Sequence, residues 1–375
     1  MKVLKFGGTS VANAESLSNV LKIVQKQKGP AAVIVSALGG ITDLLMEMLS
    51  SAQSGKQEYR KGFLEIETRH MNIIKTFVPI GNQSAIISFL KKNLNDLEAQ
   101  LDAIHLLEEA TPKNFATISS YGEILSSRII QEVFLYNDID SVYQDSRNLI
   151  KTVFHDGRQV LDQESSENAI TSFFNENKST TVLLPGYIAS NENGETTTLG
   201  RGGSDYSAAI IASAINAEVL EIWTDVSGMY TAHPKIVAQA KPIDKLSYYE
   251  AMELSHFGAK VIYPPTLQPI IEKNIPILIK NSFAPEDPGT IIDDTPIIEN
   301  GEIVKGISHI DKVALINLEG SGMIGITGFS KRLFEALSAA KINVIMITQN
   351  SRMMKKRSPD MIAPVSPTTA RLRQI

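Results

Sequence analysis

Short apolar runs alternate with amphipathic segments along residues 1–37. Residues 3–6 (VLKF) form a largely apolar run that stops at Gly7-Gly8, and apolar positions then recur at helical spacing between residues 17 and 24. Gly29-Pro30 ends this helical pattern, and residues 31–37 (AAVIVSA) have the unbroken apolar character of a buried strand. A strand, a loop, a helix and a second strand in this order predict a parallel sheet.

The same alternation returns after a long helical stretch. Residues 43–110 are polar, follow a helical pattern and contain few β-branched runs, which indicates an insertion or a helical layer. Beyond it, the patterns predict strands at 181–190, 219–223 and 276–281, and helices at 204–215 and 247–258. These elements describe one α/β domain that ends near residue 285, where Pro285, Pro288 and Gly289 mark a boundary.

A second, smaller unit is expected after this boundary. Residues 291–302 (IIDDTPIIENGE) have the polarity of a connector, and strands within 312–319 and 342–348 are predicted on either side of a helix at 329–340. Residues 351–375 have no periodicity, contain three prolines and carry six Lys or Arg against one Asp. We therefore expect this basic tail to be disordered.

Composition excludes several classes of function. The 375 residues are 43% hydrophobic with a net charge of −5, so a nucleic-acid surface, which needs a basic face, is not expected. The absence of cysteine removes disulfides, thiolate zinc sites and cysteine nucleophiles, and the six histidines lack metal-ligand spacing. No apolar run approaches the ~20 residues of a membrane helix, and the first strand begins too near Met1 for a targeting peptide. We expect no membrane segment and a cytoplasmic location.

The glycine loop after the first strand is a candidate phosphate site. A strand that ends in Gly7-Gly8 before a helix directs backbone N–H groups and the positive helix end at one place. Lys5 adds a positive charge there, and Thr9 and Ser10 add hydroxyl donors. A tight turn with an exposed lysine accounts for the same residues equally well, so this loop alone does not decide its function.

Two further loops carry candidate chemistry. In residues 197–209 (TTLGRGGSDYSAA), three glycines surround Arg201, whose guanidinium suits a carboxylate, and Asp205 stands at the start of a helix. Asp205 also fits the role of a helix cap, although three glycines exceed what a cap needs. In residues 221–235, a strand ends in Thr224-Asp225, where open α/β sheets bind ligands. An ordinary loop between strand and helix is the alternative there.

A fourth glycine set resembles a dinucleotide fingerprint but does not qualify as one. Residues 320–325 (GSGMIG) fit the G-x-G-x-x-G spacing between a predicted strand and helix. The fingerprint also needs an acidic residue after the next strand, and residues 336–359 contain none. NAD binding is therefore rejected.

Six of these stretches together resemble one family, the aspartate kinases of the amino-acid kinase superfamily. The matching motifs, in chain order, are KFGGTS (5–10), VSALGGIT (35–42), SYGE (120–123), GRGGSDYSA (200–208), WTDVSGMYT (223–231) and FGAKVIYPPTL (257–267). The resemblance covers residues 1–350. The sequence near 247–270 and 313–349 is most similar to the bifunctional aspartokinase–homoserine dehydrogenase branch.

The resemblance implies a fold and an activity. The fold would be a three-layer α/β/α kinase domain with a mainly parallel eight-stranded sheet (1–285), followed by an incomplete α+β ACT-like regulatory region (286–350) and the tail (351–375). The activity would be ATP- and Mg²⁺-dependent phosphorylation of the β-carboxylate of L-aspartate to 4-phospho-L-aspartate, the first step toward lysine, threonine and methionine. Aspartate and ATP would be the ligands, with no nucleic acid or membrane partner.

The resemblance also implies which residues form the site. Those facing the transferring phosphates would be Lys5, Gly7, Gly8 and Ser10. Those lining the nucleotide site would be Thr224, Asp225, Tyr230, Lys235, Lys260 and Val261. Those holding aspartate would be Ser36, Thr42, Glu123, Arg201 and Ser204, with Arg201 on the α-carboxylate and Glu123 near the ammonium. Lys5 and Asp205 would be catalytic, Asp205 orienting Lys5, and no protein metal site is implied.

The sequence departs from the family pattern at two places. The usual Thr-x-Asp-Pro-Arg is Thr231-Ala232-His233-Pro234-Lys235 here, which puts nucleotide affinity at that edge in doubt because lysine lacks the arginine fork. The resemblance stops near Asn350, and our hypothesis is a frameshift or a truncated gene product. An incomplete ACT region would weaken a homodimer built through ACT sheets, and it leaves feedback by threonine or lysine undetermined.

Other functions remain open at this point. A related kinase acting on glutamate or acetylglutamate is one alternative, although WTDVSGMYT and FGAKVIYPPTL favour aspartate. An inactive or purely regulatory fragment of a bifunctional aspartokinase–homoserine dehydrogenase is another.

Overall fold

The computed structural model describes residues 1–256, 262–263, 267–294, 304–310, 313–316 and 328–347. The chain forms two compact units, Met1–His309 and Ile310–Ile375, and each is described by itself. In the described residues, no helix is long and apolar enough to cross a membrane.

An eight-stranded sheet forms the centre of the first unit. Its strands are β1 (Lys2–Phe6), β2 (Ala31–Val35), β3 (Ser141–Tyr143), β6 (Thr181–Pro185), β9 (Leu220–Thr224), β10 (Lys245–Ser247), β11 (Ile277–Asn281) and β12 (Thr290–Asp293). Their order is β10-β12-β11-β9-β1-β2-β6-β3, and all neighbours are parallel except β11 and β12. The predicted mainly parallel eight-stranded sheet is confirmed.

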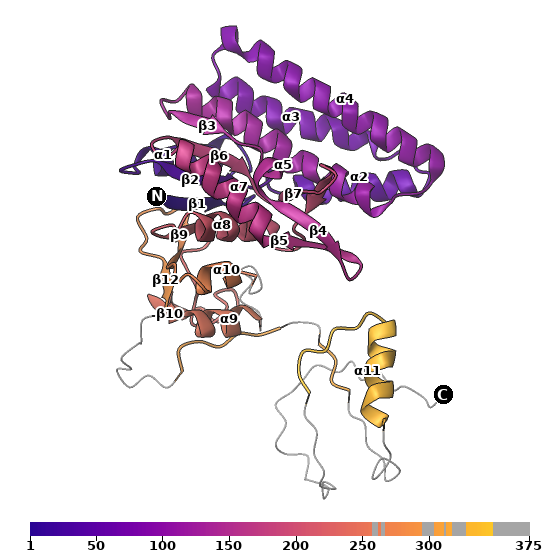
Figure 1. Cartoon of the computed structure of the whole chain (residues 1–375), viewed down its shortest axis with the longest axis vertical. Coiled ribbons are helices and arrows are strands. Elements are labelled where there is room, and N and C mark those ends of the chain that lie inside the picture. The colour runs from indigo at the N-terminus through magenta and orange to yellow at the C-terminus, as the bar shows by residue number, and fades with distance from the viewer. Residues whose placement is uncertain (257–261, 264–266, 295–303, 311–312, 317–327, 348–375) are drawn as a thin grey trace, which may run out of the picture. The chain divides into compact units, whose positions relative to one another are not determined.

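Helices cover both faces of this sheet, because side chains of each strand point alternately to either side. Leu4 and Phe6 of β1 pack in one apolar core with the helices α1 (Ala14–Gln25), α2 (Ile41–Gln53), α3 (Arg60–Phe77), α4 (Gln83–Leu107) and α5 (Pro112–Leu135). Val3 packs in a second core with α7 (Gln163–Glu176), α8 (Gly203–Ala214), α9 (Tyr248–His256) and α10 (Gln268–Ile271). The three-layer arrangement that the sequence implied is therefore present (Figure 1).

A second, smaller sheet lies beside the main one in the same unit. It contains β4 (Lys151–His155), β5 (Arg158–Asp162), β7 (Ile188–Asn191) and β8 (Thr196–Thr198) in the order β5-β4-β7-β8, next to the short helix α6 (Ser146–Leu149). A single 3₁₀ turn, η1 (Ile80–Asn82), joins α3 to α4. The helical layer expected over residues 43–110 is confirmed as α2, α3 and α4.

Two details of the predicted elements are wrong. The single strand expected at 181–190 is divided into β6 and β7, because Tyr187 adopts a left-handed φ of 66° that no continuous strand accepts. The polar connector expected at 291–302 begins with β12, which pairs antiparallel with β11 and so belongs to the sheet. The first compact unit ends at His309.

The second unit contains one helix in its described part. The predicted helix is confirmed as α11 (Phe329–Ala339). The described residues 313–316 and 342–347, expected as strands, form none, and Leu315 and Met346 within them are 89% and 73% exposed. A strand needs a hydrogen-bonded neighbour to be stable, and none pairs with these segments in the described part. The basic tail expected at 351–375 lies outside the described residues.

Candidate active site

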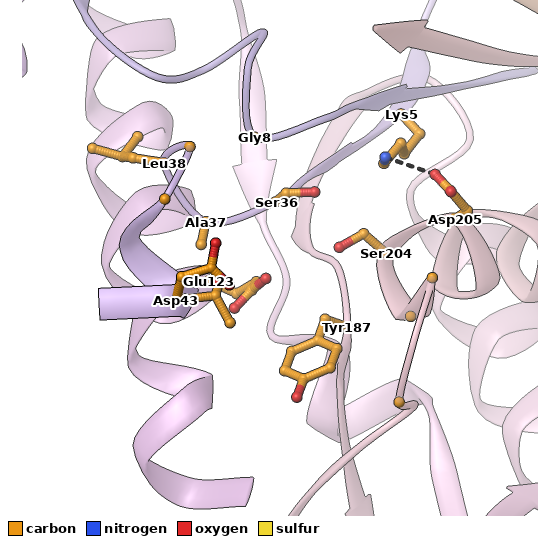
Figure 2. Close-up of a pocket in the computed structure, with 16 residues that line it drawn as sticks. Lys5, Gly8, Ser36, Ala37, Leu38, Asp43, Glu123, Tyr187, Ser204 and Asp205 are labelled. Carbon is orange, nitrogen blue, oxygen red and sulfur yellow. Dashed lines mark ion pairs between the residues drawn. The ribbon is translucent and has the colours of Figure 1, made fainter. Parts of the chain in front are cut away.

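A cavity of about 340 Å³ lies at the carboxyl ends of β1, β2 and β6 (Figure 2). Ligands of open α/β sheets bind in this position. Its walls come from the loops after β1 and β2, the start of α2, one face of α5, the turn between β6 and β7, and the start of α8 with the loop before it. The lining residues are Lys5, Gly8, Ser36, Ala37, Leu38, Gly39, Gly40, Thr42, Asp43, Glu123, Tyr187, Gly200, Gly202, Gly203, Ser204 and Asp205.

An ion pair between Lys5 and Asp205 forms one side of this cavity. Strand alternation places Lys5 on the same face of β1 as Val3, which is the face that α8 covers. Asp205 stands in the first turn of α8, and its carboxylate Oδ1 lies 2.6 Å from Lys5 Nζ. The two side chains are only 11% and 13% exposed, so each charge depends on the other for compensation.

The loops after β1 and β2 approach each other at two glycines. The backbone N–H of Gly39 donates a hydrogen bond to the carbonyl of Gly8 at 2.9 Å. A Cβ atom on Gly8 would lie 3.1 Å from the carbonyl oxygen of Ala37, and one on Gly39 would lie 3.0 Å from that of Gly8. Any larger residue would force the loops apart, and the glycines leave backbone exposed to a ligand in the cavity.

Glu123 of α5 forms the opposite side of the cavity. Burial raises the pKa of its carboxyl to about 8, although backbone N–H groups of Ala37 and Glu123 itself, together with the Lys5 charge, lower it in part. Its Oε2 atom is buried and has no hydrogen-bond partner in the described structure. A buried carboxyl oxygen without a hydrogen-bond partner costs free energy, so this atom is suited to a donor that arrives with a ligand.

Helix α5 is held firmly where it carries Glu123. It begins with a capping box in which Thr111 and Asn114 satisfy each other's backbone N–H groups, and Pro112 occupies the first turn. The hydroxyl of Ser126 donates to the carbonyl of Ser36 at 2.8 Å, which joins α5 to the loop after β2. Ser127 donates to the Glu123 carbonyl at 2.6 Å.

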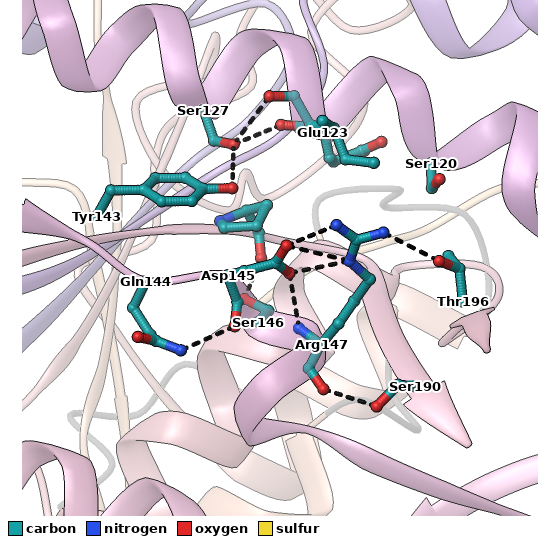
Figure 3. Close-up of polar contacts among 12 residues, drawn as sticks. Ser120, Glu123, Ser127, Tyr143, Gln144, Asp145, Ser146, Arg147, Ser190 and Thr196 are labelled. Carbon is teal, nitrogen blue, oxygen red and sulfur yellow. Dashed lines mark hydrogen bonds and ion pairs between the residues drawn. The ribbon is translucent and has the colours of Figure 1, made fainter. Parts of the chain in front are cut away.

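A polar network on the other side of α5 adds to this anchoring (Figure 3). The Ser127 hydroxyl oxygen also lies 3.5 Å from the hydroxyl of Tyr143, and burial raises the pKa of Tyr143 to about 12. Arg147 is bound to Asp145 through Nε and Nη2, and its Nη1 donates to Thr196 at 3.0 Å. Helix α5 is therefore joined to the loop after β2 through Ser126, and its Ser127 contacts Tyr143 on the other side.

Seven of the residues expected at the site line this one cavity. They are Lys5, Gly8, Ser36, Thr42, Glu123, Ser204 and Asp205. Gly7 is close to them, since a Cβ atom there would lie 3.6 Å from Lys5 Nζ.

Ser10 and Arg201 lie differently from the expectation. The hydroxyl of Ser10 is buried between the Trp223 carbonyl and the Ser282 hydroxyl, at 3.3 and 2.9 Å, and does not line the cavity. Arg201 is exposed, and its guanidinium lies 5.6 Å from the centroid of the Tyr263 ring, while its neighbours Gly200 and Gly202 do line the cavity. Arg201 thus stands at the rim.

The residues expected around the nucleotide are spread along the segment after β9. Thr224 is the last residue of β9 and donates to the carboxylate of Asp225 at 3.2 Å. Tyr230 forms an isolated bridge with Pro242, and Lys235 is exposed. None of these four residues lines the cavity. Lys260 and Val261 lie outside the described residues.

Two polar side chains of the lining, those of Tyr187 and Asp43, were not predicted from the sequence. The apolar pattern places Tyr187 in the middle of a strand, and only its left-handed backbone turns it toward the cavity. Asp43 stands in the first turn of α2, where an acidic residue also serves as an ordinary partner of the helix dipole. Asp43 directly follows the VSALGGIT motif (35–42), and this position was the one sequence feature that could have indicated a place in the site. Among the described residues, no group of three or more His, Cys, Asp or Glu could hold a metal ion.

Comparison with known proteins identifies the class. The chain belongs to the amino acid kinase family, whose sequence profile matches residues 1–281, and an ACT domain profile matches residues 316–355. The chain is 36% identical to bifunctional aspartokinase/homoserine dehydrogenase 1 of Zea mays over 93% of its own length, and 32% identical to lysine-sensitive aspartokinase 3 of Escherichia coli over 92%. These alignments cover 38% and 75% of the two relatives, so the chain spans about two fifths of the bifunctional protein.

A solved structure agrees with this assignment. Aspartokinase III of Escherichia coli, in complex with aspartate and ADP, superposes with a TM-score of 0.78 at 29% identity, over 93% of this chain and 76% of that one.

Proposed function

We propose that this chain is the kinase portion of an aspartate kinase. It would transfer the γ-phosphoryl group of ATP to the β-carboxylate of L-aspartate, which yields 4-phospho-L-aspartate and ADP. One observation carries the proposal: a nearly buried ammonium (Lys5) and a buried carboxyl oxygen without a partner (Glu123 Oε2) face the same cavity. Such a cavity suits a phosphate on one side and an amino acid's ammonium group on the other.

The acceptor would lie between Glu123 and the start of α8. An ammonium group donating to Glu123 Oε2 would supply its missing hydrogen bond and favour the ionised form of the carboxyl. The hydroxyls of Ser36, Thr42 and Ser204 border the same space and are suited to the substrate's carboxylates. Arg201 would bind the α-carboxylate after its guanidinium leaves the Tyr263 ring.

The phosphates would lie against the glycine loop and Lys5. A Cβ atom on Gly8 or Gly39 would lie 3.0–3.1 Å from backbone atoms of the neighbouring loop, so no side chain fits at either position. The backbone N–H groups there are left uncovered and are suited to donate to phosphate oxygens. Mg²⁺ would enter with ATP and supply charge neutralisation between the phosphates.

The reaction needs no general base from the protein. The attacking β-carboxylate is ionised at neutral pH, so one of its oxygens forms the new P–O bond while the bond to ADP breaks. Catalysis then consists of alignment and of neutralising the charge on the γ-phosphoryl oxygens. Lys5 would do the latter from a rigid strand end, and Asp205 would hold the ammonium in place.

The nucleotide's base and ribose would occupy the segment after β9. Strand β9 is the neighbour of β1, so Thr224 and Asp225 begin a loop next to the phosphate site. We include Tyr230, Lys235, Lys260 and Val261 in this part of the site on the family resemblance, and Ser10 among the residues near the phosphates.

A hydroxylamine trap tests the proposal. Purified chain is incubated with MgATP and L-aspartate, and the acyl phosphate is captured as the hydroxamate. We expect product from the wild type, none above background from Lys5→Ala, and undiminished product from Lys26→Ala, whose side chain is 67% exposed and pairs with an exposed glutamate. No hydroxamate from a folded wild type would reject the kinase function, whereas turnover of L-glutamate in place of aspartate would reject the substrate only.

The domain organisation and the location of the chain complete the proposal. We keep the division into a kinase domain (1–285), an ACT-like region (286–350) and a basic tail (351–375). The cytoplasmic location stays part of the proposal, and so does a homodimer.

A further inference from the structure

Arg69 connects the helical layer to both glycine loops of the site. It lies in the middle of α3, a helix that contributes no residue to the cavity wall. Its guanidinium nitrogen Nη2 donates one hydrogen bond to the carbonyl of Ala12, at 3.2 Å, and a second to the carbonyl of Gly39, at 2.6 Å. Ala12 belongs to the loop after β1 and Gly39 to the loop after β2.

These two bonds supplement a direct contact between the loops. The Gly39 N–H already donates to the Gly8 carbonyl at 2.9 Å, on the side of the loops that borders the cavity. Arg69 therefore adds two further points of attachment, from a helix outside the site. Because one nitrogen bridges the two carbonyls, a shift of either loop relative to the other must stretch a hydrogen bond to Arg69.

The strength of this connection follows from the chemistry of the side chain. Hydrogen bonds from a charged donor are stronger than neutral ones, and the planar guanidinium directs its N–H groups in fixed directions. Arg69 is 26% exposed, so solvent competes only in part for its donors. Its ion pair with Glu65 is long, at 3.8 Å, and Glu65 is 58% exposed, so that contact contributes little.

In the proposed reaction, one of the two connected loops would bind the phosphates of ATP and the other would bind the acceptor, aspartate. The loop after β1 follows Lys5 and contains Gly7 and Gly8, where the phosphates would lie. The loop after β2 contains Ser36 and leads to Thr42, where the acceptor would lie. Phosphoryl transfer requires the attacking and leaving oxygens in line, and a misplacement of about 1 Å costs on the order of 100-fold in rate.

We propose that Arg69 is a positioning residue that sets the separation between the phosphate loop and the acceptor loop. This inference rests on the proposed function. It assigns a role in catalysis to α3, which contributes no residue to the cavity wall and otherwise packs in the apolar core beside the sheet.

Matched substitutions within α3 test it. Arg69→Gln removes the bridge, Arg69→Lys keeps a charged donor without the fork, and Arg60→Gln is the control. Arg60 stands at the first residue of the same helix and pairs with Glu98 and Asp102, remote from the loops. We expect Arg69→Gln to lower kcat on the order of 10- to 100-fold with both KM values within about threefold. Arg69→Lys should recover part of that loss, and Arg60→Gln should leave kcat unchanged.

Amide hydrogen exchange gives a readout that does not depend on catalysis. Amide exchange at residues 7–13 and 36–40 should accelerate in Arg69→Gln and stay at the wild-type rate in Arg60→Gln. The two variants should have equal melting temperatures. Equal kcat in Arg69→Gln and Arg60→Gln, or unchanged exchange at both loops, would overturn the inference. If Arg69→Gln does not fold, Arg69→Lys decides the question by the same two measurements. A wild type without kinase activity rejects the proposed function, while the exchange result still decides whether Arg69 holds the loops.

Discussion

The ammonium of Lys5 and the carboxylate of Asp205 lie 2.6 Å apart at the point where β1 meets the first turn of α8. Both side chains are almost fully enclosed, at 11% and 13% exposure. A nearly buried ammonium without a counter-charge would be costly, and the carboxylate of Asp205 supplies that counter-charge in the free protein. When an anionic phosphate reaches the same ammonium, Lys5 has two anionic partners.

Asp205→Asn should separate these two roles. The substitution removes the negative charge at constant shape, so we expect the free protein to lose about 3 kcal/mol of unfolding free energy. ADP should bind at least as tightly as in the wild type, because Lys5 then has no competing partner, while kcat falls because the ammonium is no longer oriented. Thermal unfolding, calorimetric ADP titration and the hydroxamate assay measure the three quantities. Weaker ADP binding at an unchanged kcat would contradict this account.

Glu123→Gln should change how stability depends on pH. The carboxyl has a pKa of about 8 in the folded chain against 4.5 as its ordinary value. Between these values the folded state holds one proton more than the unfolded state, so stability is highest at low pH and falls by about 1.4 kcal/mol per pH unit as the pH rises toward 8. Unfolding experiments from pH 5 to 8.5 should show this slope reduced in Glu123→Gln. Glu132→Gln, which removes a more exposed carboxylate of the same helix, should retain it.

The same ionisation should appear in substrate binding. If an ammonium group binds Glu123 as a carboxylate, binding must release the proton that the free site holds below pH 8. Aspartate affinity should therefore rise with pH up to about 8 in the wild type, and proton release should be measurable by titration in buffers of different ionisation enthalpy. Affinity that does not vary over this range would show that Glu123 does not meet the ammonium.

Gly122→Ala should disturb the contact between α5 and the loop after β2. A Cβ atom at this position would lie 2.7 Å from the Cβ of Ala37, which has no flexible end to move away. We expect a loss of about 1–3 kcal/mol in unfolding free energy and a raised KM for aspartate, since Ala37 follows Ser36 in the cavity wall. Gly81→Ala is the matched control, because nothing lies within 4 Å of its added Cβ. Equal stability of the two variants would argue against close packing here.

Arg201→Lys should weaken aspartate binding while retaining the charge. Lysine cannot form the two parallel hydrogen bonds that a guanidinium makes with a carboxylate. We expect the KM for aspartate to rise roughly tenfold, with a much smaller change in kcat and in the KM for ATP. Arg158→Lys, at an exposed position on β5, serves as the control. A fall in kcat at constant KM would place Arg201 on the phosphates instead.

Most of the central sheet could be predicted from the sequence, because buried parallel strands are continuous apolar runs between glycines and prolines. Strand β9 was expected at 219–223 and occupies Leu220–Thr224. The apolar pattern did not predict a strand where hydrogen bonding to a neighbouring strand, and not the type of side chain, decides the conformation. Strand β12 contains two polar residues in four, and its place in the sheet comes from hydrogen bonds with β11 through Ile277 and Ile292. Tyr187 likewise interrupts an apolar run that is typical of one continuous strand.

The candidate site divides in the same way. Lys5, Arg201 and Asp205 could be identified from the sequence, because charged residues beside glycines at strand and helix ends are typical of sites that bind phosphates and carboxylates. Glu123 was named on the resemblance alone, and its unpartnered oxygen depends on the packing of α5 against the loop after β2. The sequence did not mark Arg69 as a residue of the site, because an arginine in the middle of an amphipathic helix is common.

The sequence by itself therefore determined the class of fold and the residue types available for phosphate and carboxylate binding, because both depend on local periodicity and on glycine, lysine and arginine chemistry. Only the tertiary structure decided which of these side chains meet. Lys5 reaches Asp205 because α8 covers that face of β1, and Arg69 reaches both loops because α3 folds back over them. Contacts between segments so far apart in the chain arise from burial of shared apolar surface, which no short stretch of residues encodes.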